Sequence, residues 1–287
     1  MNDVALRSVL YVPADNARAL AGAGRRGADV LLVDLEDPVA PDAKVTARDA
    51  ACEAVPGLVE QGCRVVLRCN HLSTTWGRDD LVAARDLPVT AICVPKVVGP
   101  EDIDEVVALT GESGPAIWSM VETPEAMLGV REVAAHPSVT VLVMGLNDLS
   151  FALRVEDRVP GRWTVLPHLC QAVLAARAEG VAIVDGAGVA LDDPEGFRAE
   201  CEQGRALGFD GKTLIHPSQV PVTNEVWSPT PGQVEDARRV AAAWDQSERE
   251  GRGVAVVDGR MIETMHVARA REILARAGVT DAPGGAG

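Results

Sequence analysis

The feature that most constrains the fold is a regular alternation of short apolar runs with longer helix-like stretches. Eight runs have the composition of β-strands, and they cover residues 8–13, 30–37, 65–70, 91–96, 117–122, 141–148, 181–186 and 211–217. Several are almost continuously apolar, which is typical of parallel strands covered on both faces. The stretches between them are rich in Ala, Leu, Glu and Arg, and several end at a glycine, a common helix stop.

This eightfold strand–helix repetition predicts an α/β fold, a (β/α)8 TIM barrel formed by residues 1–217. An open, doubly wound sheet is the alternative, because a sequence does not show whether a sheet closes. No GxGxxG motif follows the first run, which weakens a dinucleotide-binding interpretation.

The pattern changes after the eighth run. Residues 228–233 resemble a linker, and helices are expected at about 231–250 and 263–277. We therefore predict that residues 218–287 form a C-terminal helical arm or lid, with a disordered tail from about residue 279.

Composition excludes several classes of function. The formal net charge is −15 at pH 7, whereas sequence-independent binding of nucleic acid requires clustered Lys and Arg. No run approaches the ~18 apolar residues of a membrane span, and the first residues lack the pattern of a signal peptide. The six cysteines form no CxxC pair, which favours a reducing compartment. We expect a cytoplasmic protein that binds neither nucleic acid nor a membrane.

Polar residues at the ends of the apolar runs indicate where a ligand would bind. In a parallel barrel the C-terminal ends of all strands meet at one mouth, which carries the ligand-binding residues. Nearly every run here ends on a charged or strongly hydrogen-bonding residue: Asp15, Glu36, Asp37, Arg68, Asn70, Lys96, Glu122, Asp148, Asp185 and His216. Helix capping alone does not require so many.

Glu122 and Asp148 end two successive runs, the fifth and the sixth. Two neighbouring carboxylates repel each other unless a proton or a cation lies between them. A hard divalent cation with oxygen ligands, usually Mg²⁺, would satisfy both and keep coordination sites for water and substrate. The structural alternative is that Glu122 belongs to the turn before Pro124 and that Asp148 caps the following helix.

Arg68 has two interpretations of similar weight. It could bind a substrate carboxylate through two parallel hydrogen bonds, or it could pair with Glu36 or Asp37 inside the mouth. The acids of residues 34–38 would orient basic partners or metal-bound water, and one of them could be a general base. Lys96 could form a Schiff base with a carbonyl substrate, but its acidic surroundings favour an ion pair.

Segments in a fixed order resemble the HpcH/HpaI aldolase and citrate lyase β-like family. They are LYVPADNARAL (10–20), LLVDLEDPVAPDAK (31–44), LRCNHLSTTWGRDDL (67–81), VPKV (94–97), VETPEAMLGV (121–130), MGLNDLS (144–150), GFDGKTLIHPSQV (208–220) and GVAVVDGRMIE (253–263). The resemblance implies a (β/α)8 barrel, dependence on Mg²⁺ with Mn²⁺ as the alternative ion, and a homotrimer or hexamer. It also implies chemistry on a coenzyme A thioester or on an acyl-carrier partner.

The same resemblance assigns roles to individual residues. Glu122 and Asp148 resemble the metal ligands, and Arg68 resembles the group that binds the substrate carboxylate. Glu36 and Asp37 resemble acids that hold metal-bound water. Asn70 is assigned to the substrate, and Arg18 and Lys44 are assigned to the cofactor phosphates. Glu263 resembles an acid–base group in the arm. Glu263 and Met265 stand where the family usually has Asp and Pro.

The resulting expectation is a Mg²⁺-dependent carbon–carbon lyase. It would cleave or form a 3-hydroxyacyl-CoA such as malyl-CoA or citramalyl-CoA, with an acyl-CoA and an α-keto acid or glyoxylate as the other reactants. The alternatives are a free-acid 4-hydroxy-2-oxo acid aldolase, a citrate lyase β subunit that needs an acyl-carrier partner, and a malate synthase-like or thioesterase-like activity.

Overall fold

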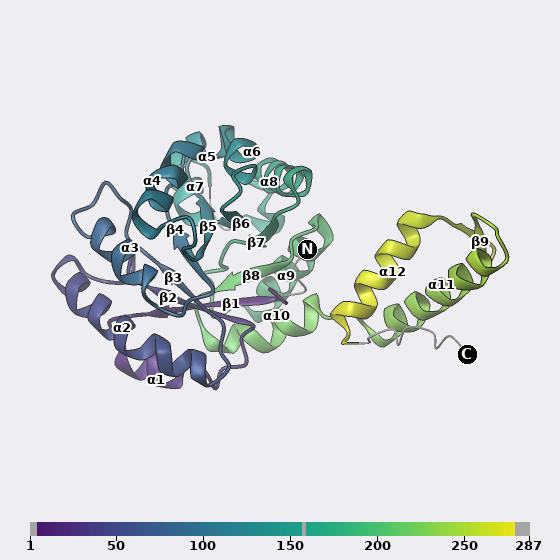
Figure 1. Ribbon diagram of the computed structural model, residues 1–287, viewed down its shortest axis with the longest axis horizontal. Coiled ribbons are helices and arrows are strands. Elements are labelled where there is room, and N and C mark those ends of the chain that lie inside the picture. The colour runs from purple at the N-terminus through teal and green to yellow at the C-terminus, as the bar shows by residue number, and fades with distance from the viewer. Residues whose placement is uncertain (1–4, 157–158, 279–287) are drawn as a thin grey trace. The chain divides into compact units, whose positions relative to one another are not determined.

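Eight parallel strands close into a barrel in chain order, and β8 pairs with β1 (Figure 1). The computed structural model describes residues 5–156 and 159–278; the tail predicted from about residue 279 lies outside these ranges. The strands are β1 (Ser8–Pro13), β2 (Val30–Asp34), β3 (Val65–Arg68), β4 (Ala91–Val94), β5 (Ala116–Val121), β6 (Val139–Met144), β7 (Ala182–Asp185) and β8 (Gly211–Leu214). The predicted barrel is therefore confirmed, and the open sheet is excluded.

Helices surround the barrel and connect its strands (Figure 1). They are α1 (Ala17–Ala23), α2 (Lys44–Glu60), α3 (Gly77–Arg85), α4 (Pro100–Thr110), α5 (Pro124–Leu128), α6 (Val130–Ala134), α7 (Leu146–Leu153), α8 (Leu166–Glu179), α9 (Pro194–Leu207) and α10 (Val220–Trp227), with short 3-10 turns η1 (Pro41–Ala43), η2 (Pro160–Arg162) and η3 (Pro217–Gln219). Local sequence explains several helix starts. Thr123 and Asp193, for example, accept hydrogen bonds from Ala126 N and Gly196 N, and a proline follows each of them.

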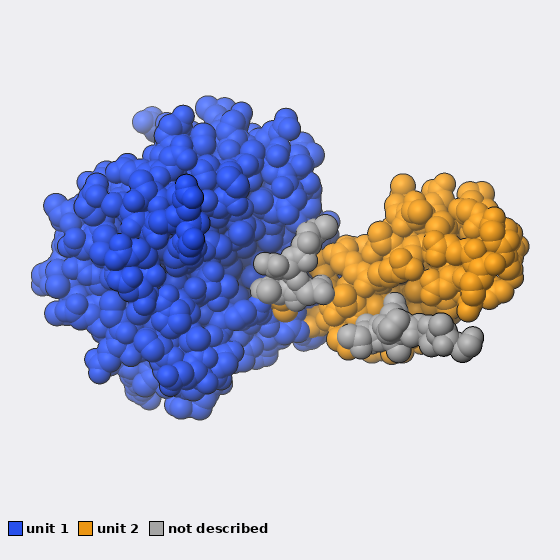
Figure 2. All heavy atoms as spheres, viewed as in Figure 1, with its two compact units in different colours: residues 1, 6–227 blue, residues 2–5, 228–287 orange. Residues whose placement is uncertain are grey.

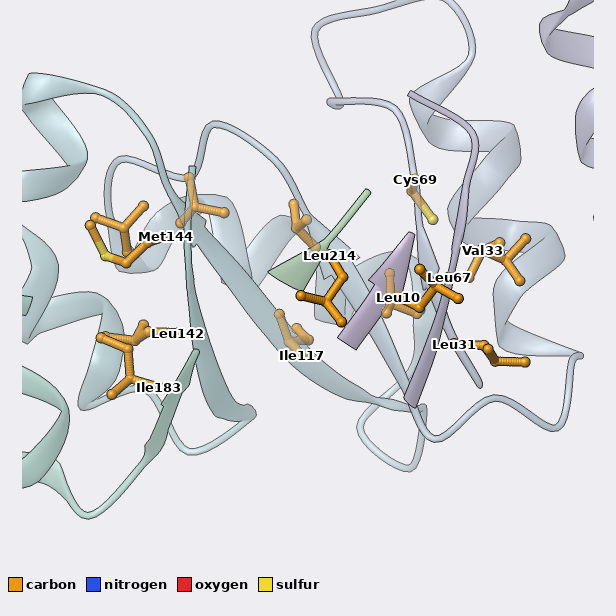
Figure 3. Packing of buried hydrophobic residues seen from close by; sticks show 14 of the residues in the cluster. Leu10, Leu31, Val33, Leu67, Cys69, Ile117, Leu142, Met144, Ile183 and Leu214 are labelled. Carbon is orange, nitrogen blue, oxygen red and sulfur yellow. The ribbon is translucent and has the colours of Figure 1, made fainter. Parts of the chain in front are cut away.

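Two apolar layers follow from the alternation of side chains along each strand. Leu31 and Val33 of β2 belong to the layer between the strands and the helices, part of which Figure 3 shows. Leu32 belongs to a second layer, made of residues from the strands, which fills the barrel interior. Asp34 and Arg68 continue the inward-facing positions of Leu32 and Val66, so both are directed into the barrel at its mouth.

The chain divides into two compact units, residues 6–227 and the described residues from Ser228 on (Figure 2). The sequence predicts the boundary at residue 217, whereas the structure places it after Trp227. The reason is that α10 packs against α9 and β1, and that the Trp227 indole donates a hydrogen bond to Phe209 O at 3.0 Å.

The second unit is a helical pair with a small hairpin. Helices α11 (Pro231–Arg249) and α12 (Thr264–Arg276) pack against each other, close to the predicted ranges. Between them the antiparallel strands β9 (Ala255–Val257) and β10 (Arg260–Ile262) turn at Asp258-Gly259, and both turn residues have positive φ, as a tight hairpin turn requires. No helix in the described ranges is long and apolar enough to cross a membrane.

Candidate active site

A buried ion pair lies at the mouth of the barrel. Asp34 and Arg68 are opposite each other in the register of β2 and β3. Arg68 Nε donates to Asp34 Oδ1 at 2.7 Å, and Arg68 Nη2 donates to Asp34 Oδ2 at 2.6 Å. The Tyr11 ring lies against the guanidinium, with its centroid 4.9 Å from Cζ. Burial by itself lowers the pKa of Arg68, but the surrounding acidic groups, Asp34 first among them, together outweigh it, so this pKa is raised and the group is a fixed positive charge.

The third guanidinium nitrogen of Arg68 faces two further acids. Nη1 lies 2.7 Å from Glu36 Oε2 and 3.2 Å from Asp37 Oδ2. The structure thus shows the pairing interpretation of Arg68, with Asp34 as the principal partner. The Asp37 side chain is 59% exposed, whereas those of Asp34 and Glu36 are buried. A substrate carboxylate would therefore reach Arg68 most easily by replacing Asp37, and the predicted carboxylate-binding role stays a prediction.

Glu122 follows β5 and is 3% exposed. Its Oε1 accepts a hydrogen bond from the backbone N–H of Lys96 at 2.8 Å. Burial, and then repulsion from Glu36, raise the pKa of Glu122 to about 7, although the Lys96 N–H acts in the opposite direction. Gly145 leaves the space that this side chain fills, because a Cβ at position 145 would lie 2.4 Å from Glu122 Cβ.

Asp148 lies in the first turn of α7 rather than at the end of a strand. The N-cap of this helix is Gly145, so the capping interpretation of Asp148 is excluded. Lys96 Nζ lies 3.6 Å from Asp148 Oδ2 and 3.1 Å from Glu36 Oε1, which confirms the predicted ion-pair role of this lysine. Burial lowers the pKa of Lys96, but the carboxylates of Glu36, Glu122 and Asp148 together outweigh it, and the net effect raises that pKa.

A cavity of about 410 Å³ opens at this end of the barrel. Its lining includes Tyr11, Asp34, Asp37, Arg68, Met120, Glu122, Gly145, Asp148 and Thr213. The predicted ligands Glu122 and Asp148 thus line one cavity, Glu122 from directly after β5 and Asp148 from the first turn of α7. The sequence signal for this convergence is the position of both acids at the ends of predicted strands.

The donor set of this cavity fits a hard divalent cation. Mg²⁺ is usually bound through one or two carboxylates, with water and substrate oxygens completing its coordination. Across residues 5–156 and 159–278, no group of three or more His, Cys, Asp or Glu has the arrangement of a closed metal site. Glu36 Oε2 is buried and, despite its ion pair with Arg68, has no hydrogen-bond partner with suitable geometry among the residues that the structure describes. Two cavity carboxylates with surplus buried negative charge suit an open Mg²⁺ site better than a protein-only cage.

Lys44 and Asn70 have structural contacts. Lys44 Nζ donates to Leu35 O at 2.9 Å and to Glu36 O at 2.6 Å, and the side chain is buried. Asn70 Nδ2 donates to Leu35 O at 3.0 Å and to the buried Asp80 at 2.7 Å. Both residues therefore hold the segment that carries Glu36 and Asp37. Their predicted contacts to cofactor and substrate remain predictions.

Two other predicted residues lie outside this network of contacts. Arg18 is exposed in the first turn of α1. Glu263 belongs to the second unit, where it precedes α12 with an exposed side chain, and its backbone N–H donates to His266 Nδ1 at 3.0 Å. The contact of Arg18 with cofactor phosphates and the acid–base role of Glu263 stay predictions.

Asp185 ends β7 but does not belong to the cavity. Because Val184 faces the barrel interior, the side chain of Asp185 faces the helices. There it is completely buried, 2.8 Å from Arg162 Nη1 and 3.2 Å from Lys212 Nζ. Asp185 therefore forms structural ion pairs with Arg162 and Lys212.

The C-terminal mouth of a parallel barrel, where this cavity lies, is where (β/α)8 barrel enzymes have their active sites. The chain belongs to the HpcH/HpaI aldolase/citrate lyase family, whose sequence pattern matches residues 7–217. The resemblance noted in the sequence is thereby confirmed.

Individual relatives cover almost the whole chain. A (3S)-malyl-CoA thioesterase of Cereibacter sphaeroides is 47% identical over 272 residues, 94% of each protein. The citrate lyase subunit beta of Escherichia coli is 32% identical over 281 residues, 94% of this chain and 93% of the relative. The crystal structure of CitE from Mycobacterium tuberculosis with magnesium, acetoacetate and coenzyme A has a TM-score of 0.80 at 29% identity, covering 96% of this chain and 99% of CitE.

Proposed function

We propose that the protein hydrolyses the thioester bond of a malyl-CoA-type substrate in the cavity at the barrel mouth. The carboxylate pair Glu122 and Asp148, next to the fixed charge of Arg68, is the observation that carries this proposal. This arrangement suits a substrate that has a carboxylate and a neighbouring oxygen as cation ligands. The choice of hydrolysis is supported by the 47% identity to a (3S)-malyl-CoA thioesterase.

Carbon–carbon cleavage, the reaction expected from the sequence, is the second candidate. It is supported by membership of an aldolase and citrate lyase family and by the E. coli citrate lyase subunit beta. Both reactions would use the same bound malyl group, and they differ in the bond that breaks. Hydrolysis breaks the C–S bond, whereas cleavage breaks the bond between C2 and C3.

Glu122 and Asp148 would hold Mg²⁺, which would supply Lewis-acid polarisation of substrate oxygens. Support for this cofactor comes from the two cavity carboxylates and from CitE of M. tuberculosis, which binds magnesium and coenzyme A. Arg68 would attract the substrate carboxylate, with Asp37 released from Nη1 as that carboxylate approaches.

In hydrolysis, a water oxygen adds to the thioester carbonyl carbon while the water transfers a proton to a carboxylate. The C–S bond then breaks, and coenzyme A leaves as a thiolate that takes up a proton. Asp37 is the best placed of the predicted catalytic acids to receive the first proton, because its side chain is exposed in the cavity while Glu36 is buried between Arg68 and Lys96. Glu263 is proposed, on the resemblance alone, as a second acid–base group.

Product analysis tests the reaction type. Purified protein would be incubated with (3S)-malyl-CoA and Mg²⁺, with EDTA as the control, and free thiol, malate, acetyl-CoA and glyoxylate would be quantified. Hydrolysis gives equal amounts of thiol and malate. Cleavage gives acetyl-CoA and glyoxylate without free thiol, which would replace the proposed reaction by the second candidate. Substrate that remains intact would overturn both.

A further inference from the structure

Lys96 contacts three acidic residues at the mouth, one through its backbone and two through its side chain. Its backbone N–H donates to Glu122 Oε1 at 2.8 Å. Its ammonium lies 3.1 Å from Glu36 Oε1 and 3.6 Å from Asp148 Oδ2. The proposed metal ligands are thus linked through a single residue, by the backbone to one and by the side chain to the other.

The backbone of Lys96 adopts a conformation that is unfavourable for a side chain of this kind. Its φ is 54°, in the left-handed region that residues other than glycine seldom occupy. A residue held in this region at a functional site is over-determined by its surroundings. Here the N–H and the ammonium of the same residue reach acids that follow different strands of the barrel.

The choice of lysine is itself informative. The whole sequence contains only three lysines, Lys44, Lys96 and Lys212, and the other 24 of its 27 Lys and Arg residues are arginines. Lysine presents a compact point charge, whereas arginine presents a planar fork of donors. The ammonium of Lys96 is half-exposed among carboxylates, where a compact cation can approach two of them from one position.

We propose that the ammonium of Lys96 and a divalent cation compete for the Asp148 carboxylate, so that Lys96 sets the affinity of the metal site. This inference rests on the proposed function, because it requires that Glu122 and Asp148 bind Mg²⁺. Lys96 is then a positioning residue: it balances the like charges of Glu36 and Asp148, and it withdraws its charge from Asp148 when the cation binds. The backbone N–H keeps Glu122 in place in both situations.

Binding of the metal itself tests this inference without any turnover. Mg²⁺ binding would be measured by isothermal titration calorimetry, and Mn²⁺ binding by electron paramagnetic resonance, for wild type and Lys96→Met. Methionine removes the charge and keeps an unbranched side chain and the backbone N–H. We expect the dissociation constant for Mg²⁺ to fall about tenfold, which corresponds to about 1.4 kcal/mol. In EDTA the same variant should unfold at a lower temperature than wild type, because Glu36 and Asp148 lose their shared counter-ion.

Two further variants serve as controls. Arg131→Met removes an exposed positive charge from α6, where Arg131 pairs with Glu179, and should leave Mg²⁺ affinity unchanged. Lys96→Gln is a second neutral variant, with the same expected tightening should Lys96→Met fail to fold. A wild type that binds no divalent cation would refute the proposed metal site and this inference with it. A wild type that binds Mg²⁺, with both neutral variants binding equally or more weakly, would refute the competition alone.

Discussion

Glu122→Gln should stabilise the protein in the absence of metal, even though it removes a proposed metal ligand. The Glu122 carboxyl is 3% exposed, and burial and the Glu36 carboxylate raise its pKa to about 7 from an ordinary value of 4.5. A carboxyl whose pKa is raised in the folded state is protonated more readily there than in the unfolded chain. Its ionisation therefore destabilises the fold above pH 7, and this penalty disappears below about pH 4.5.

The size of the effect follows from the pKa difference. A pKa difference of about 2.5 at about 1.4 kcal/mol per unit corresponds to a penalty of about 3.5 kcal/mol well above pH 7. Glutamine resembles the protonated form, and its Oε1 can still accept the hydrogen bond from the Lys96 N–H. The variant should therefore be more stable than wild type by up to about 3 kcal/mol at pH 8 and by close to nothing at pH 4.5.

Urea unfolding in EDTA, followed by circular dichroism between pH 4.5 and 8, measures this difference. Added Mg²⁺ should reverse the order at pH 8, because binding stabilises only the protein that has the intact ligand pair. A variant that is less stable than wild type at pH 8 in EDTA would show that Glu122 is not a strained carboxylate.

Two further predictions use matched pairs of substitutions. Ser119 and Ser8 are both fully buried serines of barrel strands. Within the described part of the chain, Ser119 Oγ has no hydrogen-bond partner, whereas Ser8 Oγ donates to Asn224 Oδ1 and accepts from Asp29 N. In urea unfolding, Ser119→Ala should leave the free energy of unfolding unchanged or raise it by about 1 kcal/mol, whereas Ser8→Ala should lower it by about 1–3 kcal/mol. Equal losses of stability in the two variants would contradict this reasoning. Gly145→Ala would place its Cβ against Glu122, so it should cost about 1–3 kcal/mol and weaken Mg²⁺ binding. Gly57 lies in α2, and no atom of the described residues lies within 4 Å of a Cβ added there. Gly57→Ala should therefore stabilise the protein by about 1 kcal/mol. If Gly57→Ala also weakened Mg²⁺ binding, the effect of Gly145→Ala would not be steric.

The sequence predicts the barrel well because its strands are strongly apolar and evenly spaced. It also places Glu122, Asp148 and Lys96 at one mouth, since the ends of parallel strands converge there. It does not reveal whether a polar residue at a strand end faces the barrel interior or the helices. Strands that are covered on both faces lack the alternation of polar and apolar residues that would distinguish the two directions. The inward direction of Asp34 and the outward direction of Asp185 follow only from the strand register.

Residues at loop starts are harder to assign from sequence. Lys44 and Asn70 resemble binding residues in position and type, yet both donate to Leu35 O and hold a loop in place. The roles of Tyr11 and Gly145 were also not foreseen, since one acts through its ring face and the other through the absence of a side chain. Such roles depend on contacts between segments far apart in the chain.

The most direct test of the proposed active site is the rate of thiol release from (3S)-malyl-CoA by Asp148→Asn at saturating Mg²⁺. Asp148 is half-exposed in the cavity and is not the N-cap of α7, so the variant should fold normally. Loss of one of two cation ligands should lower kcat/KM by about 100-fold or more. An Asp148→Asn variant with the full wild-type rate would contradict the assignment of this cavity as the metal-dependent active site.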